Sequence, residues 1–128
     1  MQRVLTERPD VSLELANAWH AAAHVLDPAL LHLCRLRVAM LLGCTAELDD
    51  PELVAALPDW PTADRFDARD RAVLALTEQF VIDVANIDDA LLAQARAHLG
   101  DGLADFLNAL LVTEQRQRLS LAWERLLV

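Results

Sequence analysis

The sequence predicts an all-α protein, a bundle of about six helices in a single domain that spans residues 1–128. Ala, Leu, Glu, Asp and Arg dominate the composition, and clusters of aromatic and β-branched residues, which mark strands, are missing. Apolar residues recur at helical spacing along most of the chain. Aspartate and proline stand between these stretches, as is typical of positions where helices begin.

The first three predicted helices cover approximately residues 10–25, 27–43 and 50–57. In the first, Asp10 follows a proline and can cap the free amides. The second begins with Asp27 as N-cap and Pro28 at the first helical position, and Gly43 marks its end or a kink. It is apolar nearly all the way round, which places it at the centre of a bundle or at a subunit interface. The third helix starts at Pro51.

The last three predicted helices cover approximately residues 67–84, 88–99 and 102–127. Asp67, followed by Asp70 three residues later, resembles a capping box. Asp88 caps the next helix, and Gly100 is expected to end it in the left-handed conformation. The final helix contains a stretch that is polar all round, residues 113–118, so it should pass from the core to solvent or to a polar interface.

The charge and the apolar runs exclude several classes of partner. The net charge is −9 and every basic residue is arginine, so the field of the protein repels nucleic acid and anionic lipid. No stretch approaches the roughly 18 uninterrupted apolar residues that a membrane span needs. The N-terminal residues lack the apolar core of a secretion signal. We therefore expect a cytoplasmic protein with no nucleic-acid partner and no membrane partner.

The two cysteines are too few for a secreted disulfide scaffold. If Cys34 and Cys44 lie on one helix, their ten-residue separation corresponds to about 15 Å. A disulfide needs Cα atoms about 5.5 Å apart. An intramolecular bridge is therefore excluded unless the helix breaks between them.

The candidate catalytic residues are Cys44, Glu47, His32 and Arg37. Each also has a plainer, non-catalytic interpretation. Cys44 is nucleophilic as a thiolate, which a nearby cation favours. Arg37, seven residues earlier and nearly in phase, can reach toward the sulfur, but so can solvent. The alternative is that Cys44 is a buried small apolar residue near a helix end. Glu47 is a candidate general base or a solvated carboxylate in an acidic loop. His32 is a candidate acid or base, or a hydrogen-bonded histidine in the core or at a subunit contact.

The spacing of His20 and His24 suits a metal ion, because residues i and i+4 face the same side of a helix. A third ligand is not close in the sequence, although His32, Cys44 or Glu47 can approach in space. The preferred interpretation is a polar helix face or an interface. We therefore predict neither a metal nor a cofactor.

Two stretches carry a resemblance to a known family. Leu30–Leu48 resembles the core motif of the carboxymuconolactone decarboxylase/AhpD-like superfamily. Trp60–Glu78 resembles the helix that follows it there, where a Trp, a short loop, a Phe and an acidic cap precede an Arg- and Ala-rich helix that ends in Thr-Glu. The resemblance covers roughly residues 26–119 and implies an AhpD-like helical bundle that assembles as a trimer or a hexamer.

The resemblance also shows what the site lacks. Peroxidase-type members carry a Cys-x-x-Cys pair, a Glu twelve residues before the first Cys and a His four residues after the second. Here His32 stands at the Glu position, Cys44 at the first Cys, Glu47 at the second and Pro51 at the His. Decarboxylase-type members resemble Gly-x-x-Ala-Glu-Leu followed by a His, which Gly43–Leu48 fits better, although Pro51 again replaces the His.

These residues leave two functions open. In the first, a homo-oligomer with an altered site binds a small molecule and carries out decarboxylase- or isomerase-type proton transfer through Glu47. A variant of this enzyme hypothesis uses Cys44 as the nucleophile of a single-Cys peroxidase. A thiol from another molecule then resolves the sulfenic acid that forms on Cys44. In the second, the chain is a non-catalytic helical scaffold or interaction module that kept the fold and lost the dithiol chemistry. The sequence does not decide whether the protein is an enzyme.

Overall fold

The computed structural model describes residues 9–23 and 26–126. Within these ranges the α-helices are α2 (Pro9–Ala23), α3 (Pro28–Leu42), α4 (Pro51–Ala56), α5 (Ala68–Asp83), α6 (Asp89–Leu99) and α7 (Leu103–Leu126). Short 3₁₀ helices lie between them: η1 (Thr45–Glu47), η2 (Leu57–Asp59), η3 (Val84–Asn86) and η4 (Gly100–Gly102). No strand occurs in the described residues, so the predicted all-α class is confirmed. None of the helices described is long and apolar enough to cross a membrane.

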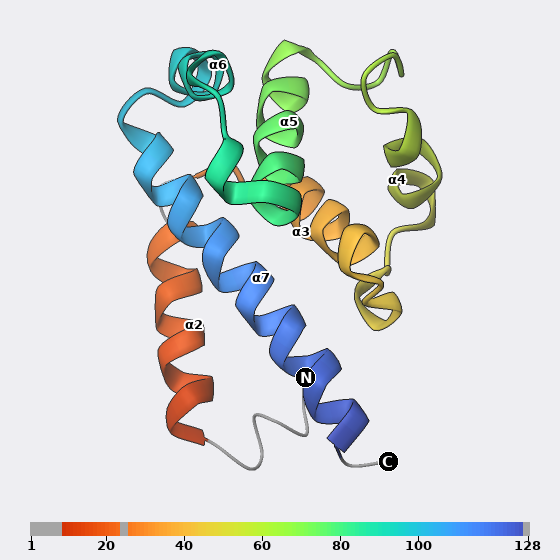
Figure 1. Cartoon of the computed structure of the whole chain (residues 1–128), viewed down its shortest axis with the longest axis vertical. Coiled ribbons are helices and arrows are strands. Elements are labelled where there is room, and N and C mark those ends of the chain that lie inside the picture. Colours follow the sequence, from red (N-terminus) through yellow and green to blue (C-terminus); the bar gives the residue numbers. More distant parts are fainter. Residues whose placement is uncertain (1–8, 24–25, 127–128) are drawn as a thin grey trace.

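Helix α3 lies at the centre of the arrangement (Figure 1). It packs against α5, α7 and the short α4. The long α7 runs alongside α2, and α6 packs on α5. The apolar circumference of α3 is thus explained by its place in the bundle, because it meets a neighbour on several sides.

The core consists mainly of two apolar clusters that share α3. One joins α3, α5, α6 and α7 through Leu30, Cys34, Val38, Val73, Leu76, Ala95, Leu103, Phe106 and Leu110. The other joins α3 and α5 to the region of α4 and the following loop through Leu33, Leu36, Leu57, Phe66 and Leu74. Because both clusters include α3, this helix fixes the relative positions of the others.

Local signals at the helix ends are confirmed in most cases. Asp27 accepts a hydrogen bond from the Ala29 amide at 2.9 Å, and Asp67 and Asp70 form the predicted capping box. Gly43 ends α3 in the left-handed conformation, with φ of 77°. Gly100 also has a positive φ, 55°, but its ψ of −129° lies outside the left-handed helical region, so this part of the prediction is wrong. The chain turns there directly into η4.

The polar middle of α7 does not simply leave the core. Thr113 and Gln117 are buried, while Arg118 is exposed and pairs with Glu114. The Gln117 side-chain amide donates to the backbone oxygen of Arg35 on α3 at 3.2 Å. This stretch therefore forms a polar contact inside the molecule, whereas the sequence pattern alone assigns it to solvent or to an interface. The contact is incomplete, because Gln117 Oε1 is buried without a hydrogen-bond partner.

Candidate functional site

Cys44 follows the C-terminus of α3 and is buried, with 3% of its surface exposed. Gly43 turns the chain out of the helix, and the Cys44 amide then donates to the Ala39 carbonyl at 2.8 Å. Burial raises the pKa of the Cys44 thiol above its ordinary value, and the negative charges of Glu47 and Glu124 raise it further. The sulfur is therefore held as the thiol, which is the less nucleophilic form.

Arg35 connects α3 to the segment that follows Cys44. One guanidinium nitrogen, Nη1, donates to the backbone oxygen of Glu47 at 2.9 Å and to its Oε2 atom at 2.8 Å. The other, Nη2, donates to Asp49 Oδ1 at 2.6 Å. The Arg35 side chain is 13% exposed, so these charge-assisted bonds are partly shielded from water.

His32 lies one turn before Arg35 on the same face of α3. Its Nε2 atom is 2.9 Å from Asp50 Oδ2, and its Nδ1 atom is 3.1 Å from Arg35 Nη2. Asp50 also caps α4 by accepting from the Leu53 amide at 3.3 Å. The hydrogen bond from His32 holds the pKa of the Asp50 carboxyl below its ordinary value, with the α4 cap as the second cause.

Helix α7 completes the cluster around Glu47. The Arg116 guanidinium lies 3.4 Å from both oxygens of the Glu47 carboxylate, and its carbon is 6.0 Å from the centroid of the Trp19 ring of α2. Glu47 thus bridges arginines of α3 and α7. In the sequence, Arg116 is only one residue of the polar stretch 113–118, and Arg35 is not distinguished from other charged residues. No pattern in the sequence pairs either arginine with Glu47.

Arg37 does not join this cluster. Its Nε and Nη2 atoms donate to Glu78 Oε1 of α5 at 2.8 and 2.5 Å, and the Trp60 indole N–H donates to the same oxygen at 2.8 Å. Arg37 would be in phase with Cys44 only on a helix that continues to residue 44, whereas α3 ends at Leu42. The structure thus brings Glu47 and His32 together through Arg35, while Cys44 lies three residues before Glu47 at the start of the same segment. The catalytic roles of Cys44, Glu47, His32 and Arg37 stay predictions.

The other polar candidates lie apart from Glu47. Cys34 is a free thiol in the core, and burial raises its pKa to about 12. His20 is exposed on α2, and His24 lies outside the described residues. Within the part of the chain that the structure describes, no group of three or more His, Cys, Asp or Glu side chains is arranged to hold a metal ion.

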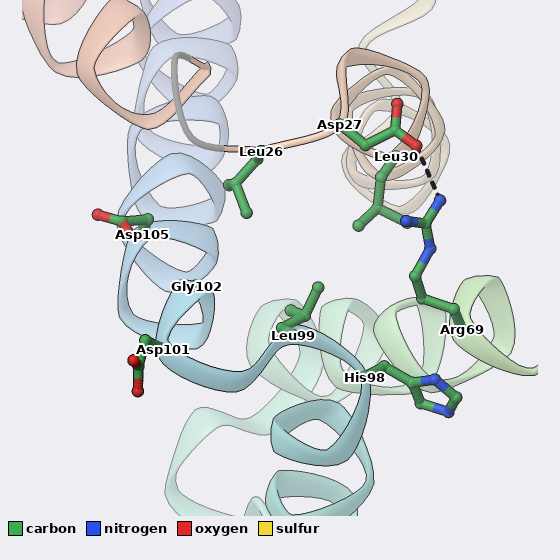
Figure 2. Close-up of a pocket in the computed structure, with 9 residues that line it drawn as sticks. All are labelled: Leu26, Asp27, Leu30, Arg69, His98, Leu99, Asp101, Gly102 and Asp105. Atoms are coloured by element: carbon green, nitrogen blue, oxygen red, sulfur yellow. Dashed lines mark hydrogen bonds and ion pairs between the residues drawn. The ribbon is translucent and has the colours of Figure 1, made fainter.

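A separate cavity of about 400 Å³ opens between the starts of α3 and α5 and the junction of α6 with α7 (Figure 2). The side chains of Leu26, Leu30 and Leu99 lie around its interior. At its edge Arg69 donates to Asp27 at 2.8 Å, and both side chains are about two-fifths exposed. Neither Cys44 nor Glu47 lines this cavity, so it does not belong to the predicted site.

The arrangement of helices matches a crystal structure of a protein of unknown function from Agrobacterium tumefaciens, provisionally described as the antioxidant defence protein AhpD. The TM-score is 0.80 over 95% of this chain and 91% of that chain. The fold is AhpD-like. At 16% sequence identity the likeness confirms the predicted AhpD-like fold and leaves the chemistry to the residues of this chain. The sequence matches no protein-family model and no curated protein at a significant level.

Proposed function

We propose that this protein has kept the AhpD-like fold, has lost dithiol peroxidase chemistry and serves as a non-catalytic helical scaffold that assembles with copies of itself. One observation carries the proposal. Glu47, which takes the place of the second cysteine of the resembling peroxidases, bridges Arg35 and Arg116 and so joins α3 to α7. A position used for chemistry in those proteins holds the helices together here.

The state of Cys44 supports the loss of peroxidase activity. Attack on a peroxide needs a thiolate, and the buried Cys44 sulfur has a raised pKa. Cys34 is also a buried free thiol, and no Cys-x-x-Cys pair exists in the sequence. An intrachain disulfide cycle at the Cys44 site therefore lacks both its nucleophile and its resolving partner.

The hydrogen-bond partners of Glu47 and His32 support the same conclusion. The Glu47 carboxylate accepts from one guanidinium at 2.8 Å and faces a second at 3.4 Å. Both ring nitrogens of His32 have partners at 2.9 and 3.1 Å. A general base needs a lone pair that is free to take a proton from the substrate, and the two guanidiniums already occupy part of the Glu47 carboxylate.

Exposed apolar side chains support assembly into a homo-oligomer, for which we propose a trimer or a hexamer. Leu13 on α2 and Leu111 on α7 are 62% and 42% exposed on two helices that lie side by side. Ile82 and Val84, at the end of α5, are 68% and 58% exposed. Large apolar side chains that remain exposed are candidates for a surface that another chain covers. A chain that remains monomeric in sedimentation equilibrium would contradict this part of the proposal.

The test of the non-catalytic function is peroxide consumption in the presence of a thiol reductant. We expect none from the parent protein. The double variant Glu47→Cys/Pro51→His restores two of the three missing family residues and leaves His32 in place. Glu47→Ser/Pro51→His is its matched control, because it removes the same carboxylate without adding a thiol. The proposal is supported if the Glu47→Cys/Pro51→His variant consumes peroxide and neither the parent nor the serine control does. It is overturned if the parent consumes peroxide and Cys44→Ser abolishes this activity.

A second function is favoured by the contact between His32 and Asp50. A carboxylate that orients an imidazole is a common arrangement for proton transfer, and His32 is 37% exposed, so a small molecule can approach it. The test is turnover of γ-lactones, with decarboxylation or isomerisation followed by NMR. If this function holds, His32→Gln and Glu47→Gln lose activity, whereas Cys44→Ser retains it.

A further inference from the structure

The ring of His32 contacts groups of opposite charge at its two nitrogens. Asp50 Oδ2 lies 2.9 Å from Nε2, and Arg35 Nη2 lies 3.1 Å from Nδ1. A guanidinium can only donate hydrogen bonds, so Nδ1 must accept. Nε2 therefore carries the proton that it donates to Asp50. This pattern of donors and acceptors requires a neutral imidazole with its hydrogen on Nε2.

We propose that His32 is a pH-sensitive latch, which in its neutral form helps Arg35 to hold residues 44–50 against α3 and, when protonated, weakens that hold and exposes Cys44. The function of the latch is to make access to the buried thiol depend on pH. It goes beyond the scaffold role, and it does not require Cys44 to be catalytic.

Protonation of His32 turns a hydrogen bond into a conflict. The added hydrogen on Nδ1 points at an Arg35 nitrogen that also carries hydrogens, so the 3.1 Å contact becomes repulsive. Asp49, the neighbouring carboxylate, is already bound to the same Arg35 nitrogen at 2.6 Å. Because Nδ1 no longer accepts, Arg35 Nη2 keeps only Asp49 as a hydrogen-bond partner.

The charges around His32 are balanced only while it is neutral. Three carboxylates, those of Glu47, Asp49 and Asp50, belong to the segment after α3. Three guanidiniums face them: Arg35 of α3, Arg116 of α7, and Arg65, whose charge acts on Asp50. A proton on His32 adds a positive charge that Asp50 faces at Nε2 but that lies directly against the Arg35 guanidinium at Nδ1. The cluster is therefore more sensitive to this histidine than an isolated ion pair would be.

Loosening Arg35 affects Cys44 because both belong to the same short segment. Cys44 directly precedes η1, and Glu47, the last residue of η1, is the residue that Arg35 holds through its backbone oxygen and its carboxylate. Gly43, the neighbour of Cys44, lines a groove of about 580 Å³ beside the C-terminal part of α7. When the segment opens, a reagent can reach the sulfur from this groove.

The experiment measures modification of both cysteines of the parent protein by 4,4′-dithiodipyridine, which reacts with thiols in acid as well as in base. Mass spectrometry assigns the modified residue, and a peptide of residues 41–48 corrects for the intrinsic pH dependence of the thiol. Between about pH 8 and about pH 5 we expect the corrected rate at Cys44 to rise about tenfold, which corresponds to the loss of one charge-assisted hydrogen bond. Cys34, buried in the core, reports global unfolding and should stay unmodified.

Two variants decide whether His32 is the cause. His32→Gln keeps a polar side chain but cannot be protonated, so its corrected rate should be the same at both pH values. Arg35→Gln removes the holding group, so its rate should be high at both. A flat rate in the parent, an equal rise in His32→Gln, or a parallel rise at Cys34 overturns the proposal. Because the readout is modification of a thiol, it can fail while the peroxide assay still supports the scaffold function.

Discussion

Two arginines that are two residues apart on α3 form ion pairs of different kinds on its two sides. Arg37 places two donors on a single oxygen of Glu78, which also accepts from Trp60. Arg35 instead divides its donors among Glu47, Asp49 and a histidine. The first site links α3 to α5, and the second links α3 to a segment that contains only one short 3₁₀ turn.

The difference shows how one helix can carry both a fixed and an adjustable contact. On the Arg37 side one carboxylate is surrounded by donors that do not titrate near neutral pH, so the contact has a single arrangement. On the Arg35 side several carboxylates and His32 share one guanidinium, and a single proton changes which of them is bound. The α3–α5 side is therefore expected to be rigid, and the side of residues 44–50 to respond to conditions.

The largest expected contrast is between the two thiols, since Cys34 marks the rigid side and Cys44 the adjustable side. With a pKa of about 12, Cys34 has a thiolate fraction on the order of 10⁻⁴ at about pH 8. We expect iodoacetamide to leave Cys34 unmodified in the folded protein and to alkylate Cys44 slowly, below the rate of a free peptide thiol, because the pKa of Cys44 is also raised. Peptide mapping measures both, and equal rates would remove the contrast.

The next largest effect is expected from Arg37→Met. The change leaves Glu78, whose side chain is 25% exposed, with the Trp60 indole as its remaining donor, and should lower the free energy of unfolding by about 2 kcal/mol. Urea denaturation measures the loss. In the double variant Arg37→Met/Glu78→Gln the loss should be smaller than the sum of the single losses, because no unpaired charge is left. Additive losses would mean that the two residues do not act as a pair.

Arg35→Met should cost less, about 1 kcal/mol, although Arg35 is buried as deeply as Arg37. Glu47 keeps Arg116 as a partner, and Asp49 is 62% exposed, so water replaces part of what is lost. The same urea experiment compares the two arginine variants under matched conditions. A larger loss for Arg35→Met than for Arg37→Met would reverse the assignment of the rigid side.

The smallest effect concerns acid. Hydrogen bonds from Arg35 and His32 lower the pKa of Asp49 and of Asp50, respectively, in the folded protein. Each carboxylate therefore adds stability above its ordinary pKa of 3.8, and this is lost as the pH falls through the lower folded value. In His32→Gln the pKa of Asp50 should move back toward 3.8, while that of Asp27, held low by Arg69, stays unchanged as the control. Carboxyl NMR titration measures both midpoints.

Local residue patterns by themselves determined the helical class and several helix ends. Asp27, Asp67 and Gly43 act on backbone groups within a few residues, so their roles can be deduced from the sequence. The absence of a second cysteine near Cys44 is also a property of the sequence. The same holds for Glu47, whose position within the family motif pointed to the site before its partners were known.

Only the tertiary structure decided which arginine meets Glu47. Helical phase favoured Arg37, but Gly43 ends α3 and the chain turns back, so that Arg35 faces Glu47 and Arg37 faces Glu78, 41 residues away. Arg116 reaches Glu47 across 69 residues. Periodicity describes neighbours on one helix and carries no information about contacts between helices, because these depend on how the whole bundle packs.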